Sequence, residues 1–392
     1  MTTSRVPLPT TRSGPFDPPA ELGALRARTP VAPLSFPDGT AGWLVTGHEQ
    51  VRAALLDPRF SARQDIRTMP PGQPAPPAAA PGFFVRMDPP EHTRYRRMLQ
   101  AQFTPRRMEL LAPRIERITQ EHLDAVADHG PPADLVPGFA VPVPSLVICE
   151  LLGVPYPDRE LFQRSTATAL DLTAGPDQVG AALSELNAYL GELVARTRRE
   201  PGDHLLGDLV RDGDLTDAEL TAMAFLLLVA GHETTANMLA LGVLALLAHP
   251  DQLAALRAEP ALADDAVEEL LRYLTIMQFG AMRVALEDFD FGGARIAAGE
   301  AVVLSLPAAN RDPARFRNPE ALDLRTPSGG HFAFGHGAHH CLGHQLARLE
   351  LRIGYTALLR RFPELRLAEP VTALPMRHGM SIYGVYRLPV AW

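Results

Sequence analysis

One short segment of the chain carries residue types that can do metal or thiol chemistry. It runs from His331 to Leu346, reads HFAFGHGAHHCLGHQL, and contains a single thiol, Cys341. The spacing of apolar residues predicts a helix over Leu342–Arg361, which places Cys341 at a helix start. Unpaired backbone N–H groups and the positive end of the helix dipole would favour the thiolate there. The glycines would let the backbone approach something large and flat, because they have no Cβ.

Two different interpretations of this segment are also open. A lone cysteine is more often a small buried hydrophobe than a ligand. A zinc site is the second interpretation, since five histidines surround the cysteine: His331, His336, His339, His340 and His344. Zinc sites with paired ligands usually need a second pair in the chain, and the second cysteine, Cys149, lies in an apolar stretch that predicts a core helix.

A second group of polar residues lies inside a long apolar stretch. Thr216 and Glu219 form a capping-box pattern and Pro250 supplies a stop, so the sequence predicts one helix over 217–248. A helix that is apolar all round is typical of the central buried element of a large helical fold. Its middle, residues 230–235, reads AGHETT, and a charged residue there argues against a membrane-spanning segment.

Helix dominates the rest of the predicted structure. Further helices are predicted over Glu49–Leu56, Pro89–Gln102, Arg106–Ala127, Pro144–Leu152, Val179–Arg198 and Asp264–Leu274. Short strands are predicted at Ala41–Val45, Phe289–Phe291, Ala301–Leu304 and Ser381–Leu388. The fold class is therefore mainly α with a small β region. We expect one domain over 1–392, with a Pro-rich segment over 1–40, an irregular loop over 69–82 and a helix cap at Asp88.

Composition excludes several classes of protein. The chain has 392 residues, and its 37 Lys+Arg are all arginine, so mechanisms that need a Walker lysine or a lysine nucleophile are ruled out. The formal net charge of -8 argues against a nucleic-acid binder that relies on phosphate neutralisation. The N-terminus lacks the basic and apolar regions of a signal peptide, so we expect a cytoplasmic protein with no membrane anchor.

The thiol segment resembles the haem-binding signature of the cytochrome P450 superfamily, FGxGxHxCxG. The fixed positions are matched at Phe334, Gly335, Gly337, His339, Cys341 and Gly343. The resemblance covers nearly the whole chain and is closest to soluble actinobacterial members. It implies haem b between the long helix and the thiol segment, with Cys341 as the axial ligand of the iron, whose thiolate favours O–O cleavage. It also implies that Phe334 packs beside the thiolate, that His339 binds a haem propionate, and that Gly335 and Gly343 lie against the cofactor.

The AGHETT run resembles the oxygen-activating motif of the same family. The resemblance implies that Thr234 supplies a hydroxyl group and Glu233 relays protons from solvent. A mid-helix glycine costs about 1 kcal/mol relative to alanine, so Ala230 and Gly231 are expected to leave room at the haem. The Thr234 hydroxyl can also bond the carbonyl four residues earlier and open the helix locally. The plain alternative is a hydrogen-bonded helix kink without chemistry.

Further motifs of the family have counterparts in this chain. Glu269 and Arg272 match its ExxR, which implies a structural ion pair, with Arg315, Arg317 or Arg325 as candidate third partners. Arginine suits carboxylates because its planar fork can bind both oxygens. The resemblance implies that three more residues hold the haem propionates: His92, Arg96 and Arg283.

The resemblance implies a monooxygenase that inserts one atom of O2 into a C–H bond (hydroxylation) or a C=C bond (epoxidation) of an apolar small molecule. A macrolide or polyketide-type secondary metabolite is the first expectation, and a terpenoid, steroid or xenobiotic is the alternative. A peroxide-driven or NO-reducing haem-thiolate enzyme and a non-enzymatic haem sensor also stay open. The candidate substrate contacts are Phe83, Phe84, Phe225, Val229, Ile276, Met277, Phe279, Ser381 and Ile382.

The expected electron source is a separate ferredoxin with its NAD(P)H-dependent reductase. A basic patch in an otherwise acidic protein could dock such a small acidic partner through complementary charge. Its residues are Arg94, Arg97, Arg106 and Arg107. An ordinary arginine-rich surface is the equally good alternative.

Overall fold

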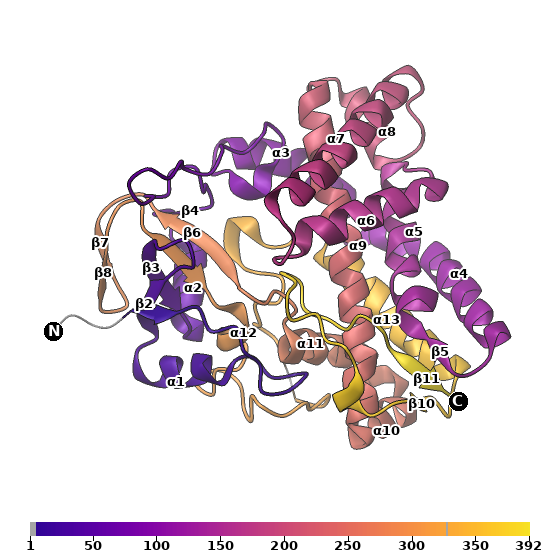
Figure 1. The fold of residues 1–392 in the computed structure, drawn as a ribbon. Helices are drawn as coiled ribbons and strands as arrows, with labels where there is room; N and C mark the ends of the chain where they lie inside the picture. Colours follow the sequence, from indigo (N-terminus) through magenta and orange to yellow (C-terminus); the bar gives the residue numbers. More distant parts are fainter. Residues whose placement is uncertain (1–4, 327) are drawn as a thin grey trace. The chain divides into compact units, whose positions relative to one another are not determined.

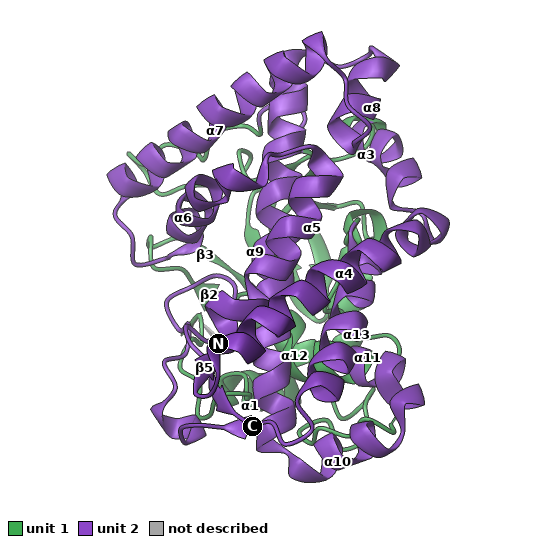
Figure 2. Cartoon of the chain, turned by 90° about the vertical axis from the view of Figure 1, so that its right-hand side faces the viewer, with its two compact units in different colours: residues 1–79, 84–94, 268–342 green, residues 80–83, 95–267, 343–392 purple. Residues whose placement is uncertain are grey.

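The computed structural model describes residues 5–326 and 328–392, and helices make up most of it (Figure 1). The chain divides into two compact units, each built from segments that are distant in sequence (Figure 2). Unit 1 comprises residues 1–79, 84–94 and 268–342, and unit 2 comprises residues 80–83, 95–267 and 343–392. The expectation of a single domain over 1–392 stays a prediction.

Unit 1 contains a sheet of six strands. In spatial order they are β1 (Val6–Pro7), β2 (Val31–Ser35), β3 (Ala41–Val45), β9 (Ala301–Leu304), β6 (Ala281–Ala285) and β4 (Phe60–Ser61). β3 pairs antiparallel with β2 and parallel with β9, so segments far apart in the sequence meet at the middle of the sheet. A separate hairpin joins β7 (Phe289–Phe291) and β8 (Ala294–Ile296). The predicted strands at 41–45, 289–291 and 301–304 are confirmed.

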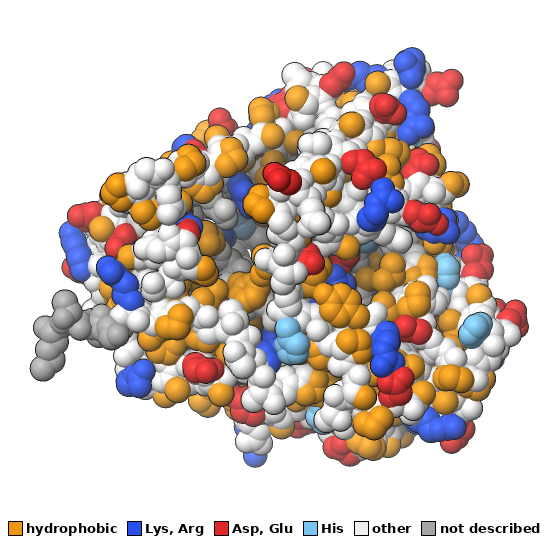
Figure 3. All heavy atoms as spheres, in the orientation of Figure 1, with side chains coloured by type: hydrophobic (Ala, Val, Ile, Leu, Met, Phe, Trp, Pro, Cys, Tyr) orange, Lys and Arg blue, Asp and Glu red, His pale blue; other side chains and the backbone are white. Residues whose placement is uncertain are grey.

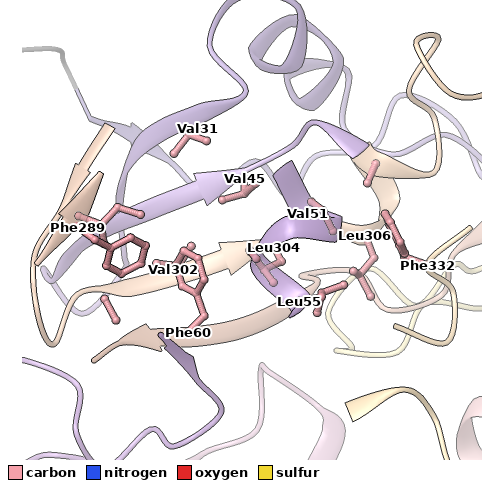
Figure 4. Packing of buried hydrophobic residues seen from close by; sticks show 14 residues of the cluster. Val31, Val45, Val51, Leu55, Phe60, Phe289, Val302, Leu304, Leu306 and Phe332 are labelled. Carbon is pink, nitrogen blue, oxygen red and sulfur yellow. The ribbon is translucent and has the colours of Figure 1, made fainter. Parts of the chain in front are cut away.

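Both faces of this sheet are covered. In β9, Val302 and Leu304 join a cluster that includes residues of α2 (His48–Leu56), and Figure 4 shows their side chains with those of Val51 and Leu55. Ala301 and Val303 belong instead to a cluster with residues of α1 (Ala20–Arg28). Alternate residues of a strand face opposite sides of the sheet, which explains why the residues of β9 are divided between the two clusters. Because both faces are buried, every residue of β9 is apolar.

Unit 2 is mostly helical. Its helices are α4 (Pro105–His129), α5 (Pro142–Leu152), α6 (Arg159–Leu170), α7 (Pro176–Arg199), α8 (Leu205–Asp212), α9 (Asp217–Ala248), α10 (Pro250–Ala258) and α13 (His344–Arg361). A small sheet has the order β10 (Arg366–Leu367), β11 (Pro389–Ala391) and β5 (Ala133–Asp134). Two helices contain residues of both units: α3 (Glu91–Gln100) and α11 (Ala263–Leu274). The short α12 (Leu306–Ala309) belongs to unit 1.

The long helix α9 has the predicted bounds. Glu219 N donates to Thr216 Oγ1, and Thr216 N donates to Glu219 Oε2 at 2.7 Å, which is the predicted capping box. The helix ends at Ala248, directly before His249 and Pro250. The helix is long and apolar enough to cross a membrane, but 67% of its most apolar 18-residue stretch is buried inside the protein, as in a core helix. Figure 1 shows α5, α6 and α7 beside it.

Two local predictions are wrong. Residues 381–388 do not form a strand, because the segment makes only isolated bridges, such as Met376 with Val385, before β11 begins. Asp88 does not cap a helix: its carboxylate accepts from Ser61 Oγ at 2.5 Å and from Ala62 N at 2.8 Å, and α3 begins later, at Glu91. The loop predicted over 69–82 has no helix or strand, as expected.

Candidate active site

The thiol segment of unit 1 is a tight loop held by its own backbone. Cys341 N donates to Phe334 O at 2.8 Å, and Gly335 N donates to Phe332 O at 2.9 Å. Gly335 and Gly337 have φ of 69° and 71°, a region that side chains with a Cβ rarely enter. A Cβ on Gly337 would also lie 2.6 Å from the carbonyl oxygen of Leu55. The glycines therefore serve the turn itself, which the sequence did not predict.

Cys341 lies before the helix and not at its first turn. Helix α13 begins at His344, with Gly343 as its N-cap, so the predicted start at 342 is two residues early. Cys341 is partly exposed, whereas Cys149 is buried and burial raises the pKa of its thiol to about 12. Cys149 is thus the inert core cysteine that was predicted, and Cys341 is the cysteine that a ligand can reach.

The surroundings of Cys341 favour one thiol ligand over a zinc cluster. In the part of the chain that the structure describes, no group of three or more His, Cys, Asp or Glu side chains is placed to hold a metal ion. The Phe334 side chain is partly exposed. A Cβ on Gly343 would meet no atom within 4 Å, so the chain leaves open space at that position.

The residues expected to bind propionates include a close pair of histidines. The rings of His92 and His339, which are far apart in the sequence, have centroids 4.2 Å apart in unit 1. Arg96 follows His92 by one turn of α3, on the same helix face. Arg283 donates to the carbonyl oxygen of Met282 at 2.9 Å, and no carboxylate within residues 5–326 and 328–392 lies within ion-pair distance of it. Burial lowers the pKa of its guanidinium and Asp88 opposes this shift, so an added anionic ligand would favour the charged form further.

The AGHETT run lies in an unbroken part of α9. Thr234 Oγ1 donates to Ala230 O at 2.7 Å, the predicted bond, but the helix continues through it without a local opening. Ala230 is exposed and Thr234 partly exposed, although most residues of this helix are buried. A Cβ on Gly231 would lie 2.7 Å from Ile148 Cδ1 of α5, and the expected role of this residue at the haem stays a prediction. Its small size therefore serves helix packing.

Glu233 and His232 point into the protein and have partners that sequence reasoning missed. Glu233 Oε2 accepts from Asn237 Nδ2 at 3.0 Å and from Arg377 Nη2 at 3.3 Å. His232 Nδ1 contacts Leu228 O at 2.7 Å, and its Nε2 contacts the hydroxyl of Thr166 in α6 at 3.0 Å. Burial lowers the pKa of His232. No spacing rule could find Arg377, because it lies 144 positions from Glu233.

The ExxR residues Glu269 and Arg272 are buried, and the guanidinium donates to both oxygens of the carboxylate. Arg272 Nε donates to Glu269 Oε2 at 2.7 Å, and Arg272 Nη2 donates to Oε1 at 2.8 Å. The remaining donors of Arg272 go to the carbonyls of Asn310, Pro319 and Ala321, and Glu269 also accepts from Asp323 N and Ser328 Oγ. These groups take the place of Arg315, Arg317 and Arg325, which were expected as third partners. Backbone carbonyls cannot be identified from side-chain spacing.

The candidate substrate contacts have different surroundings. The rings of Phe83 and Phe225 are 6.2 Å apart in unit 2, and Val229 is partly exposed one turn further along α9. Phe84 and Ile382 are buried, and Met277 packs against the core cluster of unit 1. Ser381 donates from its N and its hydroxyl to Leu170 O. The remaining two, Ile276 and Phe279, are partly exposed. A substrate role for any of these residues stays a prediction.

Comparisons with known proteins identify the family. A sequence model of the family Cytochrome P450 matches residues 192–383. Cytochrome P450 105C1 of a Streptomyces species is 54% identical over 98% of this chain and 97% of the relative. The crystal structure of CYP105P1 in complex with filipin I gives a TM-score of 0.94 at 45% identity and covers 99% of both chains. MycCI, the mycinamicin VIII C21 methyl hydroxylase of Micromonospora griseorubida, gives 0.92 at 40% identity over 99% of this chain and 100% of that one.

The chain belongs to the cytochrome P450 family, and its fold is the cytochrome P450 fold. It is a P450 monooxygenase with haem b as cofactor, of the type that acts on secondary metabolites or xenobiotics. The residues present fit this cofactor: a partly exposed thiol, open space at Gly343, and the cation Arg283 suit a flat group with a metal and two carboxylates. The expected position of haem between α9 and the thiol segment stays a prediction.

Proposed function

We propose that Cys341 binds the haem iron and that the enzyme inserts one oxygen atom into a C–H bond of an apolar secondary metabolite of macrolide or polyketide type. The carrying observation is the tight loop at 334–341, which presents one partly exposed thiol. When bound, haem supplies the activation of O2. His92, Arg96, His339 and Arg283 bind the two propionates. A cationic and imidazole set of this kind offsets the two negative charges.

Thr234 and Glu233 carry the proton chemistry in this proposal. The Thr234 hydroxyl donates to Ala230 O in the resting structure, and it can turn its proton toward a ligand on the exposed face of α9. Glu233 is the acid one residue earlier, so it can take a proton from solvent and pass it on. The small Ala230 keeps this face of the helix open.

Two solved relatives support an apolar metabolite as substrate. One was crystallised with filipin I, and another is a methyl hydroxylase bound to mycinamicin VIII. Phe83, Phe225 and Val229 offer apolar contact area for such a molecule in unit 2. Hydroxylation is the reaction that the second relative favours, and epoxidation of a C=C bond is the alternative outcome of the same chemistry.

We propose that the electrons come from a ferredoxin and its NAD(P)H-dependent reductase in the cytoplasm. Arg97 and Arg106 are exposed near the junction of α3 and α4, and Arg107 is bound to Asp208 at 3.3 Å. On the face seen in Figure 3, arginine and acidic side chains are interspersed, so local groups of charge are more relevant than the net charge.

The thiolate assignment is tested by the spectrum of the reduced, carbon-monoxide-treated protein. We expect the red-shifted band typical of thiolate coordination in the wild type and its loss in Cys341→Ser, with Cys149→Ser as the matched control that keeps it. A Cys341→Ser protein with an unchanged band would refute the assignment.

The monooxygenase assignment is tested with substrate, O2 and a ferredoxin system. We expect Thr234→Ala to lower product formed per NAD(P)H consumed by about tenfold or more, since a lost proton donor typically costs that much. Unchanged coupling, with equal turnover on peroxide alone, would favour the peroxide-driven alternative. Absence of turnover with every compound that displaces the iron-bound water would favour a haem sensor.

A further inference from the structure

The N-terminal segment of unit 1 lies against the end of α11. Arg311, which is almost fully buried, donates from Nη2 to Phe16 O at 3.1 Å and to Tyr273 O at 2.8 Å. The rings of Phe16 and Tyr273 have centroids 6.3 Å apart. One guanidinium therefore joins two backbone segments that are distant in sequence, and hydrogen bonds from a charged donor are the stronger kind.

The chain leaves α11 in an unusual backbone conformation. Thr275 has φ of 38°, a region that β-branched residues rarely enter. Its buried hydroxyl donates to Arg272 O at 2.8 Å and accepts from Asn310 Nδ2 at 2.8 Å. Because the side chain is held on two sides, the conformation of Thr275 is fixed and sets the direction of the residues that follow.

A tight turn precedes β6 and ends at Gly280. Gly280 N donates to Met277 O at 3.4 Å, so Gln278 and Phe279 lie at the tip of the turn. Gly280 has φ of 70°, and a Cβ there would collide with Leu304 O at the end of β9. The turn therefore passes directly along the six-stranded sheet, and both of its ends are fixed.

The N-terminal segment reaches the tip of this turn through Arg12. Arg12 Nε donates to Gln278 Oε1 at 3.1 Å, and Arg12 Nη1 donates to Asp17 O at 3.1 Å. Gln278 is buried and Arg12 is half-buried, so water competes little for this contact. Asp17 directly follows the anchored Phe16, so Arg12 ties the turn to a fixed part of the segment.

We propose that Arg12 is a specificity-determining positioning residue, which holds Gln278 and thereby sets where Ile276 and Phe279 lie for an apolar ligand. Ile276 and Phe279 are partly exposed, whereas Gln278 between them is buried, and all of these residues belong to unit 1. This inference rests on the proposed function, in which the enzyme binds an apolar small molecule, and on the predicted substrate contacts at these two positions. Without the Arg12 contact the tip of the turn moves between its fixed ends, and the ligand meets side chains that are less well preorganised.

The test measures how tightly the haem-loaded enzyme binds clotrimazole and imidazole. Both present an imidazole nitrogen to the iron, but clotrimazole also carries bulky aromatic rings that need apolar contacts. We expect Arg12→Ala to weaken clotrimazole binding by about three- to tenfold and imidazole binding by less than about twofold. Arg5→Ala is the matched control, because Arg5 is exposed on the same N-terminal segment, and it should bind both compounds like the wild type.

Gln278→Ala removes the same contact from the other side, and it decides the question if Arg12→Ala does not fold. We expect the same selective loss of clotrimazole affinity and no further loss in the double variant, because the two residues act through one hydrogen bond. Unchanged clotrimazole binding, additive losses in the double variant, or equal losses for the two compounds would overturn the inference.

A second readout needs no ligand. Hydrogen exchange of the backbone amides over 276–280 should be at least about threefold faster in Arg12→Ala than in the wild type. The amides of α9 should keep their rates. An unchanged exchange rate at the turn would show that Arg12 does not hold it, and the inference would be wrong.

The outcomes separate this inference from the proposed function. If neither compound binds the iron of the wild type and the carbon-monoxide band is missing, the haem-thiolate assignment is itself wrong, and the role of Arg12 in selectivity is wrong with it. If both compounds bind the wild type but Arg12→Ala changes neither their relative affinity nor the exchange rates, only the role of Arg12 is wrong.

Discussion

At the scale of single residues, the buried ion pair of α11 is the contact whose loss should cost most. Glu269 holds Arg272 with two bonds, and both side chains are almost fully buried. Removing one partner of such a pair leaves a charge without its counter-charge. We therefore expect Glu269→Ala to lower the free energy of unfolding by about 3–5 kcal/mol, measured by urea denaturation.

The matched control is the surface pair of Arg295 with Asp290, whose side chains are 61% and 79% exposed. Asp290→Ala should change the free energy of unfolding by less than about 0.5 kcal/mol. Equal losses in the two variants would show that the burial of the Glu269 pair is not what stabilises the fold.

Glu350 predicts a dependence of stability on pH. It is buried in α13, its Oε2 has no hydrogen-bond partner in the described residues, and burial raises its pKa well above the ordinary value of 4.5. The folded state thus holds a proton that the unfolded state releases above about 4.5. The stabilisation from this proton is complete below that pH and is lost as pH rises toward the folded pKa.

Glu350→Gln removes this titration and keeps the shape of the side chain. Its stability relative to the wild type should rise with pH, by at least about 1 kcal/mol between about pH 5.5 and about pH 7.5, measured as urea midpoints. Glu369→Gln is the opposite control, since Arg387 lowers the pKa of Glu369 and its removal should not stabilise the protein. A pH-independent difference for Glu350→Gln would contradict the assignment.

The sequence was informative about chemical groups and poor about their partners. Cys341, Thr234, Glu233 and the ExxR pair could be singled out because each lies in a short pattern whose members are neighbours in the chain. Arg377 could not, because only the folded chain brings it to Glu233. The contact of Gly231 with Ile148 could not be predicted for the same reason: the atoms of Ile148 that exclude a Cβ belong to another helix.

At the scale of elements, α9 is positioned by close contact with α13. Tyr355 Oη donates to Met238 O at 2.7 Å, and a Cβ on Gly242 would collide with this hydroxyl. Alanine is the better helix former, so propensity alone predicts a gain in stability for Gly242→Ala. The steric conflict reverses the sign, and we expect a loss of about 1–3 kcal/mol.

Gly191→Ala in α7 is the control for this variant. A Cβ on Gly191 would meet no atom within 4 Å, so only helix propensity should determine the effect of this substitution. We expect the free energy of unfolding to rise by about 0.5–1 kcal/mol. Thermal unfolding of the two variants side by side measures both effects. A stabilised Gly242→Ala protein would show that Tyr355 moves without cost.

The elements that the sequence predicted best are those whose ends carry local signals. The bounds of α9 follow from the Thr216 capping box and Pro250, both within a few residues of the helix ends. The segment 381–388 was predicted as a short strand from its residue types, but a strand also needs a continuous partner, and this segment has bridges at single positions. The helices that were missed are α1, α6, α8, α10 and α12, and α6 has no side-chain cap at its start.

At the scale of the whole molecule, an acidic protein must still attract an acidic electron donor if the donor is a ferredoxin. The exposed Arg97 and Arg106 provide the local positive charge in our proposal. We expect the double variant Arg97→Glu, Arg106→Glu to slow reduction by ferredoxin about tenfold at low salt. The effect should shrink as salt is added, because surface charges are screened.

Arg295→Glu, a charge reversal on the exposed hairpin strand β8, is the control for this experiment. It changes the net charge in the same direction at another place, by half as much as the double variant does. If it slows reduction as much as the double variant does, the overall charge and not the proposed patch guides the donor.

The contacts of Glu233 with Asn237 and Arg377 have a consequence for how the protein is made. Glu233 is synthesised 144 residues before the arginine that donates to it. At about 5–20 residues per second, the growing chain carries this carboxylate for about 7–30 s without its counter-ion. Arg377 can therefore reach Glu233 only after every helix of unit 2 has been synthesised.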